Sequence, residues 1–354
     1  MSFTPHTYKL SGDIEIFFTD TGAPPNSSDY KTLIVLHGAA FNGHGFERLH
    51  EHAHSLNLRV VLWNRREYPG STKYTDAELE EVAEGKKVFL DRLGQQMSEW
   101  LLQFIEKENI PPSTDQKTGG IAIVGWSLGC AWALTLFADP KVSSPEATRI
   151  LEKYVKDVVL YDPPHLSLGY ELNPERDFYN PWTDPDCKTP EETYRAFTHW
   201  VSSFFDHKSS DTGDFDDMDL TTKRSENPTI AQWTQEEFSK WVSPDAAARS
   251  ELKLYVKPMQ TRISEMAEAV FFDAKLIDSY FPDLKVTVIV CARTQWHSLW
   301  ASLETMKRYK AHIADGKPAR PTQLIKIDGI NHYAHHETPK LLLEKIVEGT
   351  RAEL

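Results

Sequence analysis

A single serine stands between two glycines in the stretch IAIVGWSLGC, residues 121–130. The β-formers before Ser127 predict a short buried strand and the apolar residues after it predict a helix, so Ser127 falls where a strand becomes a helix. A turn this sharp brings Gly125 and Gly129 together, which is easiest where neither residue carries a Cβ. The hydroxyl of Ser127 is then exposed as a potential nucleophile. Such a hydroxyl needs a nearby base and N–H donors for the oxyanion that its attack creates.

Strands and helices alternate on both sides of this turn. Continuous apolar runs predict buried strands in KTLIVLHG from Lys31, LRVVLWN from Leu58, VKDVVLYDPP from Val155 and LKVTVIVCA from Leu284. Apolar residues at helical spacing between these runs predict amphipathic helices, the longest over residues 86–110. Because strands that alternate with helices form parallel sheets, we predict an α/β fold with a mostly parallel central sheet flanked by helices.

The alternation is interrupted over residues 166–282, which hold many aromatic residues but no strand-like apolar run. We therefore predict that residues 1–165 and 283–354 form one core domain and that residues 166–282 are an inserted, mainly helical cap. A cap above the sheet edge would exclude water and supply an apolar pocket for a medium-sized, partly hydrophobic substrate. The alternative is that the aromatic residues only form the core of a small helical domain.

Three motifs resemble those of the α/β-hydrolase fold superfamily and occur in that family's order. They are HGAAFNG after the first buried strand, Gly-Trp-Ser-Leu-Gly at the sharp turn and DGINHYAHHETP near the C-terminus. The resemblance covers nearly all of the chain outside the insertion. It implies that Ser127 is the nucleophile and that the backbone N–H groups of Leu128 and Ala39 form the oxyanion hole. Read without the family, His37-Gly38 is an ordinary strand end with a turn glycine.

The same resemblance indicates His332 as the base among the fourteen histidines. His332 has a glycine three residues before it, a glutamate five after and a proline seven after, as in the family's last loop. His335 and His336 are the nearest alternatives. No carboxylate or thiolate pattern completes a tetrahedral set with this cluster, and the three histidines within residues 50–54 point to different sides of a helix. We therefore predict no metal site and no cofactor.

The acid of the triad departs from the commonest family pattern. Thr294 stands where that pattern carries a carboxylate, and threonine cannot stabilise an imidazolium. Some family members carry the acid one strand earlier, and Asp162 stands at the carboxyl end of the strand VVLYDPP. The resemblance thus implies the triad Ser127, Asp162 and His332. Asp328, four residues before His332, is the alternative acid, and Asp162 would then be an ordinary turn residue before two prolines.

Two further stretches have no assigned chemistry. NRREYPGS, residues 64–71, resembles the family's Asp-x-Arg-Gly-x-Gly-x-Ser turn in altered form, and we interpret it as structural. Trp296, His297 and Trp300 follow a predicted strand and could either line the mouth of a pocket or pack the next helix.

Composition limits the partners of the protein. The chain has 39 basic and 52 acidic residues and a formal net charge of −13, which argues against nucleic acid or an anionic membrane as a partner. Three widely spaced cysteines indicate neither a disulfide framework nor a zinc site and are consistent with a reducing compartment. The sequence has no apolar run of signal-peptide length at the N-terminus and no stretch of about eighteen apolar residues. We expect a cytoplasmic protein that acts on a small molecule. The sequence leaves open whether the protein forms a homo-oligomer.

These inferences predict a serine hydrolase that cleaves an ester, lactone or related acyl bond through an acyl-enzyme intermediate. An acyltransferase, a cyclase or a carbon–carbon bond hydrolase would use the same nucleophile, and product analysis with competing nucleophiles separates these outcomes. A ligand-binding receptor that retains the fold is the other alternative, and a fluorophosphonate probe tests it. Epoxide hydrolases and dehalogenases are disfavoured because they call for aspartate where this chain has Ser127.

Overall fold

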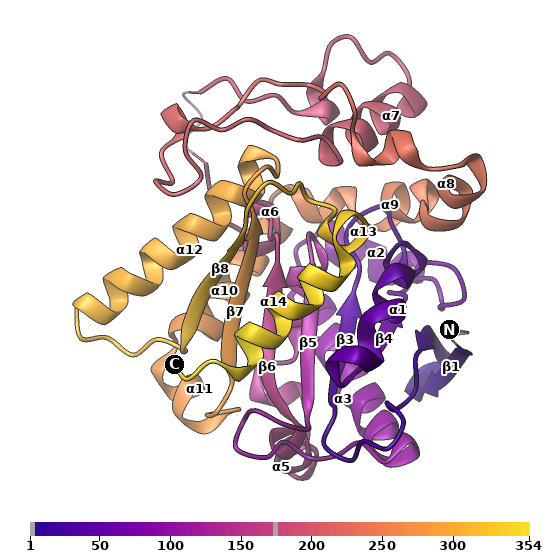
Figure 1. Cartoon of the computed structure of the whole chain (residues 1–354), viewed down its shortest axis with the longest axis vertical. Coiled ribbons are helices and arrows are strands. Elements are labelled where there is room, and N and C mark those ends of the chain that lie inside the picture. Colours follow the sequence, from indigo (N-terminus) through magenta and orange to yellow (C-terminus); the bar gives the residue numbers. More distant parts are fainter. Residues whose placement is uncertain (1–3, 173–175) are drawn as a thin grey trace.

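Eight strands form one sheet in the order β1-β2-β4-β3-β5-β6-β7-β8 (Figure 1). The computed structural model describes residues 4–172 and 176–354. The antiparallel strands β1 and β2 form one edge, and every pair from β4 to β8 is parallel, which confirms the predicted mostly parallel sheet. The strands are β1 (Thr4–Leu10), β2 (Ile14–Asp20), β3 (Lys31–Leu36), β4 (Leu58–Trp63), β5 (Ile121–Trp126), β6 (Val155–Tyr161), β7 (Lys285–Cys291) and β8 (Thr322–Ile327).

The central strands are buried on both faces because helices cover the sheet on both sides. Every residue of β3, β4, β5 and β7 is buried, as expected for parallel strands rich in branched apolar side chains. One face carries α3 (Lys87–Glu108), α4 (Gly129–Thr135), α5 (Pro145–Tyr154) and α10 (Met259–Phe272), and the other carries α1 (His50–Ala53) and α14 (Pro339–Arg351). The shorter elements α2 (Asp76–Ala83), α11 (Ala274–Ser279) and α13 (Ala334–Glu337) lie outside these layers or at their ends, and α12 (Trp296–Ala314) packs on β7 and β8.

The long helix α3 illustrates how the sequence sets the bounds of an element. Its apolar residues recur at helical spacing, and Trp100, Leu101 and Phe104 are fully buried against the sheet. The helix ends where Asn109 adopts the left-handed conformation, with φ of 51°, two residues before Pro111. The observed bounds agree with the helix predicted over residues 86–110.

The described residues between β6 and β7 form helices and loops, and most of them lie above the carboxyl ends of the strands (Figure 1). They include α6 (His165–Leu168), α7 (Pro190–Val201), α8 (Gln235–Trp241) and α9 (Pro244–Ser250). In contrast, α10 leaves this layer and packs against α4 beside the sheet. The division of the chain at residues 166 and 282 stays a prediction. Among the described helices, none is both long and apolar enough to cross a membrane.

Candidate active site

Ser127 lies on the sharp turn between β5 and α4. Its φ is 54°, in the left-handed region, and its amide donates a hydrogen bond to the carbonyl of Tyr161 at 3.0 Å. A Cβ at Gly125 would lie 2.5 Å from the carbonyl oxygen of Gly129, and a Cβ at Gly129 would lie 2.4 Å from that of Leu36. Both positions therefore require glycine. For Gly125 the reason is the close approach of Gly129 that the sequence spacing predicts, whereas for Gly129 the reason is the end of β3, which lies against it.

Asp162 and His332 form a buried hydrogen-bonded pair at the same edge of the sheet. Nδ1 of His332 lies 2.5 Å from Oδ2 of Asp162, and neither side chain is exposed. Because a carboxylate accepts here, Nδ1 carries the proton and Nε2 has a free lone pair. Nε2 is buried and has no hydrogen-bond partner among the described residues. The imidazole can therefore accept a proton at Nε2.

Three donors surround the carboxylate of Asp162. In addition to His332, the amide of Cys291 donates to Oδ1 at 2.9 Å and the hydroxyl of Thr294 donates to Oδ2 at 2.5 Å. Thr294 occupies the position at which the family's commonest pattern carries the acid. Its role as a donor was missed from the sequence because it depends on β6 and β7 being neighbours in the sheet.

Asp328 lies apart from this pair. Its side chain is 82% exposed, and its carboxylate is 3.7 Å from Nζ of Lys326. Within residues 4–172 and 176–354, the carboxylate that is hydrogen bonded to His332 is that of Asp162.

The backbone of His332 is also fixed. Its carbonyl accepts hydrogen bonds from the indole N–H of Trp126 at 3.0 Å and from the hydroxyl of Tyr161 at 2.9 Å. Of the two neighbouring histidines, His335 stacks on an aromatic ring with a centroid separation of 4.0 Å, and burial lowers the pKa of His336 to about 4. No group of three or more metal-ligating side chains occurs in the part of the chain that the structure describes.

The two predicted oxyanion donors lie beside Ser127. Ala39 and Leu128 both line the cavity that Ser127 lines, and within the described ranges neither amide donates a hydrogen bond to the protein. A Cβ at Gly38 would lie 2.8 Å from Cβ of Ser127, so the loop after β3 packs directly against the turn after β5. Two unpaired amides next to a serine can bind the oxygen of a tetrahedral intermediate.

A cavity of about 750 Å³ opens above Ser127. Arg176 and Asp177 stand among its lining residues. Much of its wall is aromatic and comes from the segment above the sheet and from α12: Phe178, Tyr179, Trp182, Phe197, Trp200 and Trp296. Two histidines, His165 and His297, also line it. Burial lowers the pKa of His165 to about 3 and holds that of His297 well below its usual value, so both imidazoles are neutral near pH 7.

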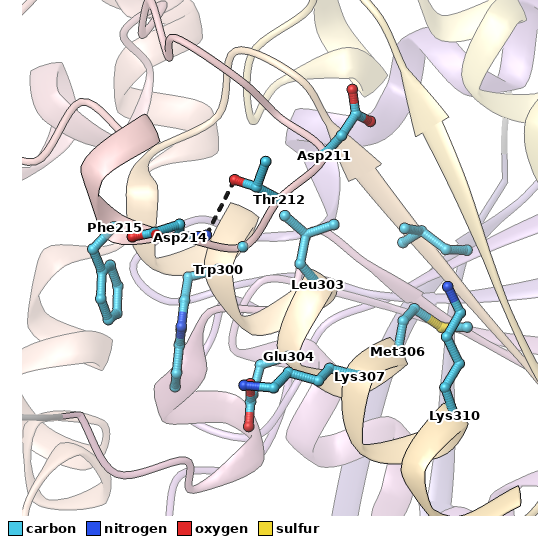
Figure 2. A pocket seen from close by; sticks show the side chains of 12 residues that line it. Asp211, Thr212, Asp214, Phe215, Trp300, Leu303, Glu304, Met306, Lys307 and Lys310 are labelled. Carbon is cyan, nitrogen blue, oxygen red and sulfur yellow. Dashed lines mark hydrogen bonds and ion pairs between the residues drawn. The ribbon is translucent and has the colours of Figure 1, made fainter. Parts of the chain in front are cut away.

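A second hollow of about 730 Å³ lies on the other side of α12 (Figure 2). Trp300, Leu303 and Lys307 project into it from α12, opposite a loop that contains Asp211. Ser127 lines the first cavity and does not line this hollow, so the candidate active site is the first cavity. The helix thus divides the three aromatic residues noted in the sequence: Trp296 and His297 face the candidate site, whereas Trp300 faces the second hollow.

Comparison with known proteins defines the family. A model of the alpha/beta hydrolase family matches residues 33–345, and the chain therefore belongs to that family. This confirms the resemblance drawn from the three motifs. A search of curated protein sequences gives no match.

Solved structures with the same fold include enzymes of several kinds. The chain is similar to a putative aryl esterase from Burkholderia cenocepacia, with 15% identity, a TM-score of 0.54 and 98% of each chain covered. It is also similar to a bromoperoxidase from Bacillus anthracis, with 15% identity, a TM-score of 0.52 and coverage of 98% of this chain and 100% of the other. A haloalkane dehalogenase variant from Bradyrhizobium elkanii gives 12% identity, a TM-score of 0.52 and coverage of 99% and 96%. These similarities show a shared fold.

Proposed function

We propose that the protein is a serine hydrolase that cleaves an ester, lactone or related acyl bond through an acyl-enzyme intermediate. The observation that carries the proposal is the buried Asp162–His332 pair, whose Nε2 has no partner among the described residues, at the sheet edge where Ser127 stands on a strained turn. Membership in the alpha/beta hydrolase family supports the same reading.

The proposed reaction has two steps. Ser127 attacks the acyl carbon while Nε2 of His332 takes the hydroxyl proton, and Asp162 stabilises the imidazolium that results. The amides of Ala39 and Leu128 bind the oxyanion. His332 then protonates the leaving group. In the second step a water molecule attacks the acyl carbon and loses a proton to Nε2, and the bond between the acyl carbon and the Ser127 oxygen breaks as Nε2 returns that proton to Ser127 and the acid is released.

The cavity supports an uncharged, ring-containing substrate. Aromatic walls favour a planar apolar group, and a volume of about 750 Å³ is within the range of pockets for small organic ligands. Nδ1 of His165 and Nε2 of His297 are buried without a hydrogen-bond partner among the described residues, and both imidazoles are neutral. Hydroxyl or carbonyl groups on the substrate would satisfy such nitrogens without introducing a buried charge.

The proposal extends to the setting of the reaction. Three unpaired cysteines and a net charge of −13 support a cytoplasmic protein whose partner is a small molecule rather than nucleic acid or a membrane. The aromatic walls support a role for the insertion, residues 166–282, as a cap that shields the bound substrate from bulk solvent.

Hydrolysis of a panel of aryl and alkyl esters by the wild type and by Ser127→Ala tests the proposal. We expect aryl esters to be cleaved faster than esters with a charged acyl group, and we expect Ser127→Ala to lose at least about 10³-fold in kcat. Added alcohols or amines measure how the acyl-enzyme divides between hydrolysis and transfer. Undiminished turnover by Ser127→Ala would refute the proposal.

A further inference from the structure

Glu251 comes from the segment above the sheet, yet its carboxylate is buried beside the loop that follows β3. The residue follows α9 and is 1% exposed. Oε1 of Glu251 is hydrogen bonded to the guanidinium of Arg65, which comes from the core. Oε2 accepts a hydrogen bond from the amide of Ala40 at 3.1 Å. One carboxylate thus bridges a buried cation and the loop that carries Ala39.

Arg65 holds the same loop from its carbonyl side. Nη2 of Arg65 donates to the carbonyl of Gly38 at 2.8 Å, and Nε donates to the carbonyl of His37 at 3.1 Å. The guanidinium also lies over the ring of Trp132, 4.3 Å from its centroid. Because Arg65 is almost fully buried, Glu251 is the carboxylate that neutralises it.

These contacts fix both peptide groups that flank Ala39. In a trans peptide the carbonyl oxygen and the amide hydrogen point in opposite directions. The carbonyl of Gly38 points to Arg65, so the amide of Ala39 points away from Arg65. The amide of Ala40 points to Glu251 and to the hydroxyl of Tyr68, whose oxygen accepts a hydrogen bond from this amide at 2.8 Å. Ala40 has φ of 68°, a conformation that a residue other than glycine keeps only when its surroundings enforce it.

We infer that Glu251 is a positioning residue of the oxyanion hole. Its carboxylate fixes one flanking peptide directly and the other through Arg65, and so aims the amide of Ala39 at the carbonyl oxygen of the substrate. The inference rests on the proposed serine hydrolase function. It makes the oxyanion hole depend on a residue that lies in sequence within the predicted cap, so that docking of the segment after α9 completes the catalytic site.

Glu251→Gln tests this inference with little change in volume. Arg65 and Ala40 donate to different oxygens of the carboxylate, and in the carboxamide an NH2 group takes the place of one of these oxygens, so one of the two hydrogen bonds is lost. With an aryl ester, we expect kcat to fall by roughly 10- to 100-fold and KM to stay within about threefold, because the ground state does not use the oxyanion hole fully. The affinity for an arylboronic acid, which forms a tetrahedral adduct on the serine, should fall by the same factor as kcat/KM.

The matched control is Asp157→Asn, which removes the carboxylate of another buried ion pair. Asp157 lies 2.8 Å from Nζ of Lys31 at the opposite edge of the sheet and contacts nothing near Ala39. We expect this variant to lower the Tm but to keep kcat and boronic acid affinity within about twofold. If Glu251→Gln does not fold, Tyr68→Phe removes only the hydroxyl that accepts the amide of Ala40, and we expect kcat to fall roughly threefold to tenfold with KM unchanged.

Retention of kcat and of boronic acid affinity in Glu251→Gln, or in Tyr68→Phe where that variant replaces it, would overturn the inference. So would losses in Glu251→Gln that only match those of Asp157→Asn. If the wild type neither cleaves esters nor reacts with a fluorophosphonate, the proposed function fails by itself. The positioning claim is then decided by the crystal structure of the folded variant: a rotated peptide group on either side of Ala39 supports it, and unchanged peptide groups overturn it.

Discussion

Replacing Asp162 by asparagine should disable His332 while leaving the surrounding structure intact. Oδ1 of Asp162 accepts a hydrogen bond from the backbone amide of Cys291. This amide can only donate, so it cannot accept a hydrogen bond from an NH2 group. The carboxamide oxygen of Asp162→Asn must therefore stay at that position, and its NH2 group must face His332 and Thr294. Because Nδ1 of His332 then faces the NH2 group, which is a donor, Nδ1 must be the unprotonated nitrogen and Nε2 becomes the protonated one.

The cost follows from this change of tautomer. A histidine protonated at Nε2 cannot take the proton of Ser127, and loss of a triad carboxylate in this way lowers kcat by roughly 10⁴-fold. That factor corresponds to about 5.4 kcal/mol of transition-state stabilisation. KM should change little, because Asp162 does not line the cavity. Asp328→Asn is the control, and we expect at most about a twofold effect since its side chain is 82% exposed.

Steady-state kinetics on a reactive aryl ester, with Tm measured for each variant, separate catalysis from folding. A kcat of Asp162→Asn within tenfold of the wild type would refute the reasoning. So would a larger loss in Asp328→Asn than in Asp162→Asn, which would move the acid to the loop after β8.

Three other perturbations test separate parts of the site. Thr294→Val keeps the shape of the side chain but removes a hydrogen-bond donor to Asp162, so kcat should fall roughly tenfold. Thr294→Ser keeps the hydroxyl and should retain activity in the same kinetic assay. Gly38→Ala places a methyl group 2.8 Å from Cβ of Ser127 and should lower both kcat and, by about 1–3 kcal/mol, the free energy of unfolding in urea; an unchanged kcat would contradict the packing described. His165 has a pKa of about 3 in the folded protein against 6.5 for an unperturbed histidine, so the unfolded chain binds more protons between these values and stability falls as pH is lowered from about 6.5 toward 3. His165→Phe should make that fall shallower in urea titrations, and an identical slope would show that His165 is not buried as a neutral group.

The features that could be predicted from the sequence are those that a local pattern determines. Gly125 is required because a Cβ there would meet the backbone of Gly129 and Cys130 within the turn itself, and helix α3 follows from apolar residues that repeat at helical spacing. The parallel sheet follows from the alternation of apolar runs with helices. Each of these needs only neighbours along the chain.

The features that escaped the sequence depend on contacts between distant segments. The hydrogen bond from Thr294 to Asp162 exists because β6 and β7 are adjacent, and no spacing in the chain encodes that neighbour relation. No sequence pattern singles out Glu251, and Arg65 belongs to a stretch that the sequence predicts to be structural. The two residues meet beside Ala39 only because the segment after α9 packs against the loop that follows β3.

The most direct test of the central claim is the reaction of the native protein with a fluorophosphonate, followed by mass spectrometry of the intact chain and its peptides. We predict the addition of one phosphonyl group, located on Ser127, at a rate that falls sharply in Asp162→Asn and to nothing in Ser127→Ala. A native protein that stays unlabelled, or that is labelled to the same extent in Ser127→Ala, would contradict the assignment of Ser127 as an activated nucleophile.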